Sequence, residues 1–217
     1  KCGTETKAEQ CDNCQYVPTI EDMKDGICRE CGAKTVLKEN KNLYLALSKF
    51  QKAIEEHTKK SSKLWRANAK NETNKYLKQG LVDRAVTRDL DWGIDIPIEG
   101  YEDKKMYVWI DAVLGYVTAT KKWCQENGQD WEQYWKEEHN NEIYMVHGKD
   151  NIVFHSIIFN ALLLALKENY HLVDTIVSSE YLNINDEKIS KSKGNGIPAI
   201  ELADRYNPDS LRFHLIN

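Results

Sequence analysis

The sequence lacks a long hydrophobic run, an internal repeat and a low-complexity tract. Its longest apolar stretch, residues 157–166, is interrupted by Asn160 and is too short to span a bilayer. No basic and then apolar leader opens the chain, so we expect a cytoplasmic protein without a membrane anchor. The net charge of −4 does not favour a dedicated nucleic-acid-binding module, although a local basic patch could still bind RNA.

The composition provides ample material for a core. Of the 217 residues, 41% are hydrophobic and 29% are charged, which is typical of a globular chain with one large domain or one domain and a small module. The chain opens with "KCG" and has no initiator methionine, so we expect a piece of a longer protein.

Apolar runs of strand length alternate with helical patterns in the second half of the chain. We expect strands at 104–112, 142–148 and 174–184, the first of them covered on both faces, and helices near 112–127, 131–138, 151–167 and 197–206. Earlier, residues 42–57 and 64–79 predict two helices, and 84–97 a short strand and loop. This alternation predicts an α/β fold with a largely parallel sheet.

Five of the six cysteines lie within the first 31 residues, four of them in two Cys-x-x-Cys pairs. Disulfides would suit a secreted protein, but this spacing favours metal in a reducing cytosol. Two thiolates from each tight turn give the tetrahedral set of a closed, structural Zn²⁺ site. Either the two pairs share one zinc, or each belongs to a separate site. The candidate ligands are Cys2, Cys11, Cys14, Cys28 and Cys31.

Two segments place polar residues where predicted strands end. In "HGKDNIVFH", Gly148 allows a ligand to approach the backbone, Lys149 offers a cation and Asp150 can accept from ribose hydroxyls. A helix-capping Asp150 in an ordinary loop is the alternative. In "YVWIDAVLGY", core packing would explain Trp109 but not Asp111.

A third segment, "KISKSK" at residues 188–193, places three lysines and two serines between two ordered elements. Lysines on a loop suit phosphate oxygens whose charge grows in a transition state, and serines add hydroxyl donors. Taken alone, this segment is also typical of a solvated surface turn.

The three segments together resemble one family. "KISKS" resembles the KMSKS signature of class I aminoacyl-tRNA synthetases, with isoleucine in place of methionine. "YVWIDAVLGY" and "HGKDNIVFHSIIF" resemble the YVWxDAxxGY and GKDxxxFH segments of the methionyl-tRNA synthetase family, and "VTRDLDWG" and "NPDSLRFHLIN" are similar to it as well. The DVWFDS-like segment of the isoleucine and valine enzymes is absent from the sequence.

This resemblance implies ATP-dependent activation of methionine to methionyl-adenylate, with Mg²⁺, and transfer to tRNA(Met). Lys191 and Lys188 would act on the triphosphate, with Ser190, Lys149 and Asp150 also in the ATP site. The residues that would form the methionine pocket are Trp109, Ala112, Tyr116, Asn151, His155 and Phe159. Tyr116 and His155 could offer weak hydrogen bonds to the thioether sulfur. Val113 stands where many members of the family have proline, and Asn151 stands where some have isoleucine.

The implied fold is a Rossmann-like, parallel-sheet half domain with a small zinc-knuckle insertion module. We expect the knuckle module at 1–40, the helical remainder of the insertion at 41–103, the second half of the catalytic domain at 104–197 and the start of the following helical region at 198–217. The HIGH signature of the class is absent from these residues, so we expect them not to activate methionine by themselves. The alternatives are a class I synthetase for another amino acid and a non-catalytic, zinc-dependent RNA-binding protein.

Overall fold

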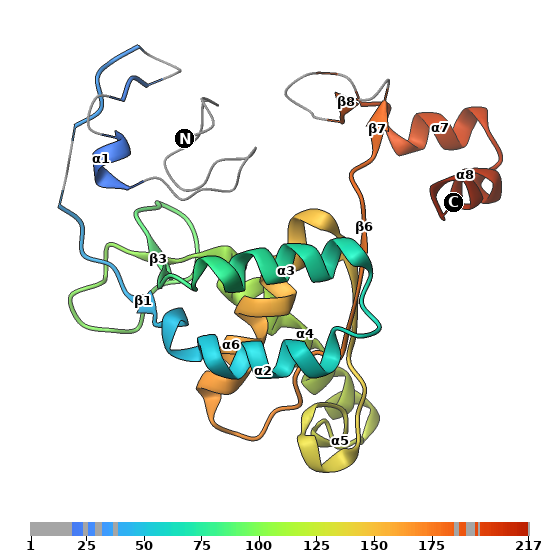
Figure 1. Cartoon of the computed structure of the whole chain (residues 1–217), viewed down its shortest axis with the longest axis horizontal. Helices are drawn as coiled ribbons and strands as arrows, with labels where there is room; N and C mark the ends of the chain where they lie inside the picture. The colour runs from blue at the N-terminus through green and yellow to red at the C-terminus, as the bar shows by residue number, and fades with distance from the viewer. Residues whose placement is uncertain are drawn as a thin grey trace. The chain divides into compact units, whose positions relative to one another are not determined.

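The computed structural model describes residues 19–23, 26–28, 32–36, 39–184, 187–189, 194 and 196–216. The chain divides into two compact units, Lys1–Asn42 and Leu43–Asn217. Figure 1 shows the elements of both units. The larger unit carries the segments in which we expect adenylate chemistry.

In the smaller unit, the described residues form helix α1 (Ile20–Met23) and a tight backbone turn. The Cys28 carbonyl accepts a hydrogen bond from the Gly32 N–H at 2.8 Å, and the Cys28 N–H donates to the Ala33 carbonyl at 2.8 Å. Gly32 has a φ of 70°, a left-handed conformation that glycine adopts without strain. Cys2, Cys11, Cys14 and Cys31 lie outside the described residues.

The larger unit begins with helices and short strands. These elements are β1 (Tyr44–Leu45), the 3₁₀ helix η1 (Leu47–Phe50), α2 (Gln51–Ser61), α3 (Ala67–Gln79), β2 (Arg84–Ala85), β3 (Thr87–Arg88) and β4 (Lys105–Met106). The pairs β1–β2 and β3–β4 are antiparallel. The two expected helices are confirmed from Leu47 and from Ala67 onward, with α2 preceded by η1, whereas residues 44–45 of the first expected helix form β1 instead.

The elements that follow carry the candidate site. They are α4 (Val108–Asn127), α5 (Glu132–Trp135), η2 (Glu137–His139), β5 (Tyr144–Gly148), η3 (Lys149–Asn151), the π-helix η4 (Phe154–Ile158), α6 (Phe159–Leu166), β6 (Thr175–Ser179), β7 (Asn183–Ile184), β8 (Glu187–Lys188), α7 (Ala199–Arg205) and α8 (Pro208–Ile216). The strands β5 and β6 pair in parallel from Tyr144↔Thr175 to Gly148↔Ser179, and the helical run from η3 to α6 connects them. The predicted α/β fold with a parallel sheet is confirmed by this βαβ unit.

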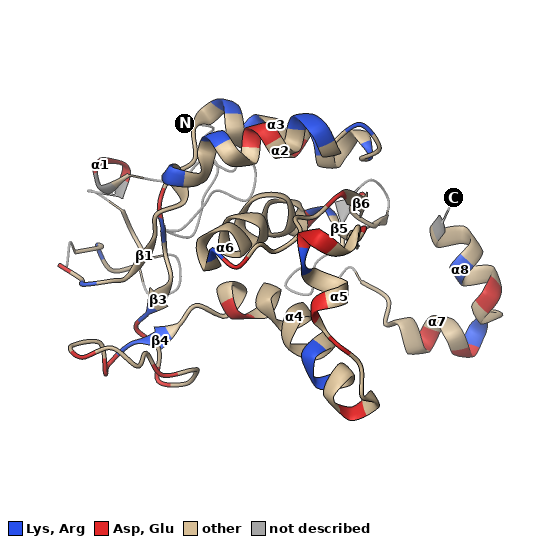
Figure 2. Cartoon of the chain, turned by 90° about the horizontal axis from the view of Figure 1, so that it is seen from below, with Lys and Arg blue, Asp and Glu red and all other residues tan. Residues whose placement is uncertain are grey.

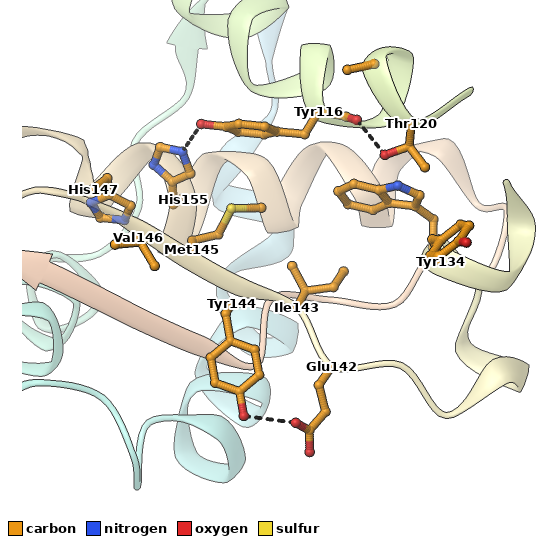
Figure 3. A pocket seen from close by; sticks show the side chains of 12 residues that line it. Tyr116, Thr120, Tyr134, Glu142, Ile143, Tyr144, Met145, Val146, His147 and His155 are labelled. Carbon is orange, nitrogen blue, oxygen red and sulfur yellow. Dashed lines mark hydrogen bonds between the residues drawn. The ribbon is translucent and has the colours of Figure 1, made fainter. Parts of the chain in front are cut away.

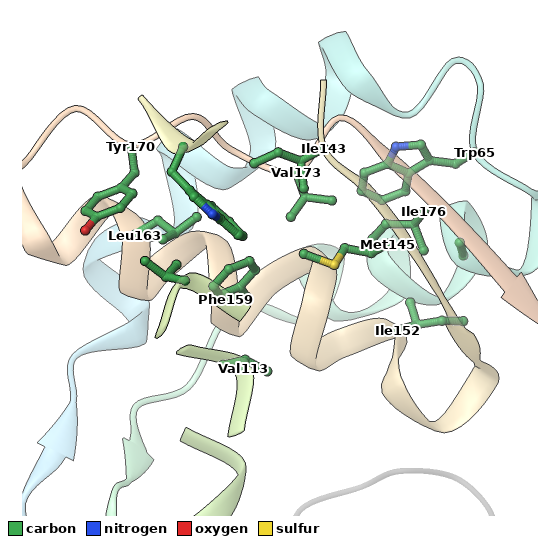
Figure 4. Packing of buried hydrophobic residues seen from close by; sticks show 13 residues of the cluster. Trp65, Val113, Ile143, Met145, Ile152, Phe159, Leu163, Tyr170, Val173 and Ile176 are labelled. Carbon is green, nitrogen blue, oxygen red and sulfur yellow. The ribbon is translucent and has the colours of Figure 1, made fainter. Parts of the chain in front are cut away.

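The core surrounds α6. Phe159, Ala161 and Leu163 of this helix are at most 1% exposed. Figure 4 shows Phe159 and Leu163 packed with residues of β5 and β6, among them Met145 and Ile176. Figure 2 shows α6 almost without charged residues, as a helix enclosed by other elements should be.

Helix α3 is fixed to the βαβ unit by buried hydrogen bonds. The Thr73 hydroxyl donates to the Ser156 hydroxyl at 2.9 Å. Asn68 accepts from the Ser178 hydroxyl at 2.7 Å and donates to the Ser178 carbonyl at 3.2 Å. These bonds satisfy polar groups that would otherwise be costly to bury, and they fix the helix against one strand of the parallel pair.

The predicted strand at 104–112 is wrong beyond residue 106. The strand β4 covers two residues, and the helix α4 begins at Val108. Ile110, Val113 and Val117 are buried at spacings of three and four residues, whereas Trp109 is 40% exposed. Helical periodicity over 20 residues therefore outweighs the local run of strand-forming residues. Asp111, which core packing does not explain, lies in the first turn of α4, where the helix dipole favours a carboxylate.

Within the described part of the chain, the helical stretch Lys149–Leu166 is long and apolar enough to cross a membrane by length and composition alone. Half of it is buried inside the fold, as is typical of a core helix.

Candidate active site

A cavity of about 530 Å³ opens between α4, α5 and β5. Figure 3 shows the side chains that surround it. The lining residues are Tyr116, Ala119, Thr120, Tyr134, Trp135, Glu142, Ile143, Tyr144, Met145, Val146, His147 and His155. Two of the six residues predicted for the methionine pocket, Tyr116 and His155, line this cavity. Its size and its mainly aromatic and apolar lining suit a small amphipathic ligand.

Tyr116 and His155 form a hydrogen-bonded pair with a defined direction. Nδ1 of His155 lies 2.8 Å from the Asn151 carbonyl, which can only accept, so Nδ1 carries a hydrogen. Burial lowers the pKa of His155, and the neighbouring His147 lowers it further. The neutral ring must then accept at Nε2, and the Tyr116 hydroxyl donates to it at 2.9 Å. Both donor hydrogens are therefore engaged. To donate to a sulfur, Tyr116 must give up its bond to His155.

His147 is a site residue that the sequence analysis missed. Its ring stacks on that of His155, with centroids 4.3 Å apart and planes inclined by 23°. Its Nε2 is buried and has no hydrogen-bond partner among the described residues. Residues of a strand alternate between its faces, so His147 shares a face with the buried Met145. That alternation was the signal that could have identified it.

The other predicted pocket residues lie around this cavity without lining it. Trp109 stacks on Phe154 at 4.8 Å between centroids, and Ala112 is exposed one turn further along α4. Asn151 contributes its backbone carbonyl, which holds His155. Phe159 is fully buried, with its ring 6.0 Å from that of Tyr116, and therefore belongs to the core.

His155 lies in the π-helix η4 rather than in regular α-helix. A π-helical turn within a longer helix is rare in proteins and is frequently found at functional sites. Here it occurs next to the end of β5, where the segment "GKD" begins.

The predicted ATP residues Lys149 and Asp150 lie in η3, directly after β5. Lys149 Nζ is 2.7 Å from a carboxylate oxygen of Glu180, and this contact lowers the pKa of Glu180. The Tyr181 hydroxyl donates to Asp150 Oδ1 at 2.6 Å. Glu180 and Tyr181 directly follow the end of β6. The two residues after β5, Lys149 and Asp150, therefore contact the two residues after β6.

The segment "KISKSK" at residues 188–193, called the lysine loop below, begins at the end of the hairpin β7–β8. Asn183 pairs with Lys188, and the Ile189 N–H donates to the Leu182 carbonyl at 3.1 Å. Lys188 is therefore placed in β8, whereas the predicted ATP residues Ser190 and Lys191 lie outside the described residues. The hairpin starts two residues after Tyr181, at Asn183, so the chain leads from the contact with Asp150 into the hairpin.

A methionine–tRNA ligase from Alkaliphilus oremlandii is 46% identical to this chain over 215 residues, and one from Bacillus mycoides is 44% identical over 216 residues. Each match covers 99% of this chain and 39% of the relative. The chain thus spans about two fifths of the length of these relatives.

A solved structure of Mycobacterium tuberculosis methionyl-tRNA synthetase in complex with methionyl-adenylate aligns with 88% of this chain and 36% of its own. The TM-score is 0.68 at 25% sequence identity. The family described as tRNA synthetases class I (M) matches residues 1–217, the whole sequence. The chain therefore belongs to the class I tRNA synthetases of this family.

Proposed function

We propose that this chain is part of a methionine–tRNA ligase, which activates methionine with ATP and transfers it to tRNA(Met). The observation that carries this proposal is the arrangement at the end of β5, where Lys149 and Asp150 directly follow the strand that lines the cavity of Tyr116 and His155. An amino acid in that cavity would have its carboxylate near the nucleotide that these two residues receive. The relatives named above support methionine as this amino acid.

The first step is attack of the methionine carboxylate on the α-phosphate of ATP, which releases pyrophosphate. In our proposal Asp150 accepts from ribose hydroxyls, and Lys149 lies beside it. Lys188, Ser190 and Lys191 bind the triphosphate, whose charge Mg²⁺ shares. Positioning and charge stabilisation are what a protein can contribute to such a transfer.

Gly148 supports a ligand at the end of β5. A Cβ atom built on it would meet only the Ser179 hydroxyl oxygen, at 3.9 Å, an ordinary contact. Its φ is −76°, which any residue adopts. The fold itself therefore tolerates a side chain here, and close approach of a ligand to the backbone gives a reason for the glycine.

The cavity receives the methionine side chain. The aromatic rings of Tyr116, Tyr134 and Trp135 form part of its lining, and a thioether sulfur makes favourable contacts with the edges of aromatic rings. Trp109 and Ala112 follow the same face of α4 as Tyr116, at spacings of three and four residues, and extend this surface. Phe159 supports the site from behind, through its contact with the Tyr116 ring.

The smaller unit holds a structural Zn²⁺ in this proposal. The turn after Cys28, with the Gly32 N–H bonded to the Cys28 carbonyl, fits the tight turn that a Cys-x-x-Cys pair forms around a metal. Thiolates of Cys11, Cys14, Cys28 and Cys31 would form a closed tetrahedral set, with Cys2 completing a further pair. We also propose that the whole protein acts in the cytoplasm, without a membrane, and binds tRNA there.

The test of the catalytic proposal uses the full-length enzyme and methionine-dependent exchange of pyrophosphate into ATP. Lys191→Ala should cut the rate of adenylate formation at least about 100-fold and leave the affinity for methionine nearly unchanged, because the lysine acts on transition-state charge. Lys60→Ala, which removes an exposed lysine of α2, is the control. Unchanged exchange by Lys191→Ala would contradict the role of the loop. Exchange driven by another amino acid in preference to methionine would contradict the substrate.

The test of the zinc proposal is metal analysis of the 217-residue chain. We expect bound zinc, and Cys28→Ser should reduce its amount, whereas Cys124→Ser, which replaces a buried cysteine of α4, should leave it unchanged. A metal-free chain whose smaller unit stays folded would contradict a structural site.

A further inference from the structure

The parallel register of β5 and β6 determines which residues meet beyond the strand ends. Gly148↔Ser179 is the last pair of the ladder. The next residues along the two strands then lie side by side: Lys149 reaches Glu180 at 2.7 Å, and the Tyr181 hydroxyl reaches Asp150 at 2.6 Å. Two neighbouring contacts therefore join the segment "GKD" to the segment that leads into the lysine loop.

The contact between Tyr181 and Asp150 is a directed, charge-assisted hydrogen bond. A phenol donates and a carboxylate accepts, and such bonds are stronger than those between neutral groups. The Tyr181 ring is partly buried, and Lys149 Nζ lies 5.6 Å from its centroid. Burial, and next the bond to Asp150, raise the pKa of the Tyr181 hydroxyl far above its usual value, so the donor stays protonated at any physiological pH.

A bond to one carboxylate oxygen fixes the rotation of the carboxyl group about its last side-chain torsion. The plane in which Asp150 accepts further hydrogens is thereby set before a nucleotide arrives. Loss of this bond would widen the range over which the carboxyl group rotates about its broad, two-fold torsion, and part of that freedom would be lost again each time a nucleotide binds.

We propose that Tyr181 is a positioning residue of the nucleotide site, which orients the Asp150 carboxylate toward the ribose hydroxyls and fixes the start of the lysine-loop hairpin beside it. This inference rests on the proposed role of Asp150 in binding ribose. Tyr181 does not touch the reacting atoms in this scheme and acts on the ribose through Asp150.

The experiment uses the full-length enzyme and the Tyr181→Phe variant, which removes the hydroxyl and keeps the ring. Pyrophosphate exchange is measured with ATP, with 2′-deoxy-ATP and with 3′-deoxy-ATP. We expect kcat/KM for ATP to fall about tenfold, the cost of losing one charge-assisted hydrogen bond, with the KM for methionine unchanged. One of the two deoxynucleotides lacks the ribose hydroxyl that Asp150 accepts from. The ratio of kcat/KM for ATP to kcat/KM for that deoxynucleotide should fall by the same factor.

Tyr170→Phe is the matched control. Tyr170 is likewise buried and has a lysine over its ring, with Lys136 Nζ 4.2 Å from the centroid. It belongs to the core cluster and lines no part of the site. A purely structural effect of losing a tyrosine hydroxyl would appear in stability for both variants and would leave the ratio between ATP and deoxy-ATP at the wild-type value.

Asp150→Asn separates the inference from the function on which it rests. If Asp150→Asn lowers the preference for ATP and Tyr181→Phe lowers it too, with no further loss in the double variant, the inference holds. If only Asp150→Asn lowers it, Asp150 binds ribose and the role of Tyr181 is overturned. If neither substitution changes it, the ribose role of Asp150 fails and the inference fails with it.

Discussion

The two stacked histidines give the candidate pocket a neutral, hydrogen-bonded wall. His155 uses Nδ1 for the Asn151 carbonyl and Nε2 for the Tyr116 hydroxyl, so its ring is held at both nitrogens. His147 covers the face of that ring. A wall of this kind presents aromatic surface to an apolar side chain, and it admits a charged group only at the cost of breaking these bonds.

Tyr116→Phe tests this wall. Without the hydroxyl, Nε2 of His155 loses its donor, and the ring is held at one nitrogen only. We expect the KM for methionine in the full-length enzyme to rise about two- to tenfold, in line with the net contribution of one hydrogen bond, while the KM for ATP stays the same. Steady-state exchange kinetics measure both constants. Tyr206→Phe, at a 59% exposed residue, is the control. A larger effect on ATP than on methionine would contradict the assignment.

The histidine pair also predicts how stability depends on pH. Burial lowers the pKa of His147 below 6.5, and burial together with His147 lowers that of His155. The folded state then binds fewer protons than the unfolded state just below pH 6.5, so the free energy of unfolding falls as the pH drops through that value. His147→Phe keeps an aromatic ring on His155 and removes one titrating group, and it should make this fall shallower.

Urea unfolding of the 217-residue chain between pH 7.5 and 5 measures this change. His57 and His171 titrate in both proteins and cancel in the comparison. Leu166→Phe, at an exposed position of α6 without a titrating side chain, serves as the control and should keep the wild-type slope. A steeper fall in His147→Phe would contradict the predicted sign.

Single residues were predictable from the sequence where a motif carried them, and less so where packing decides. Tyr116 and His155 were expected in one pocket and do line one cavity, although the resemblance gave no geometry. His147 was missed because its place on the face of the buried Met145 follows only from the alternation of residues along β5, and the expected site residues came from motifs instead. Phe159 was expected in the pocket; it is buried behind Trp135 and Tyr116, which line the cavity, and its part in the pocket stays a prediction.

At the scale of elements, a short window of sequence predicted the wrong secondary structure at residues 108–112, where the pattern over a longer window indicates a helix. Residues 104–112 read locally as a strand because valine, isoleucine and aromatic residues are concentrated there. The helix α4 forms because the burial pattern of Ile110, Val113, Val117 and Cys124 continues over 20 residues. The strand β5 and the helix after it were predicted correctly, since Gly148 and the apolar helix mark their own limits, whereas the single strand expected at 174–184 is divided into β6 and β7. The domain boundaries stay predictions.

The burial of α6 predicts very different costs for two leucines of the same helix. Leu163 is 1% exposed, and Leu166 is 45% exposed. Leu163→Ala should lower the free energy of unfolding by about 2–5 kcal/mol, from lost burial and the cavity left behind, and Leu166→Ala by less than about 0.5 kcal/mol. Urea unfolding of both variants measures the difference. Similar losses at both positions would mean that α6 does not lie at the centre of the core.

For the whole molecule, the 217 residues include the GKD and KISKS segments and no HIGH signature. The resemblance to class I synthetases implies that the HIGH segment supplies a further part of the nucleotide site. We therefore expect these residues, purified by themselves, to show no methionine-dependent pyrophosphate exchange above a heat-treated control, whereas the full-length enzyme is active in the same assay. Robust exchange by the 217 residues would show that the described site is sufficient.

The parallel pairing of β5 and β6 also sets a delay during synthesis. Each residue of β5 pairs with one 31 positions further along, as in Tyr144↔Thr175. At translation rates of about 5–20 residues per second, β5 leaves the ribosome roughly 1.5–6 s before its partner. For that interval its backbone can pair with the wrong strand, and Val146, 77% exposed even in the folded chain, would favour such mispairing. If α6 forms early and packs on β5, it shortens the time for which β5 can pair with a wrong strand.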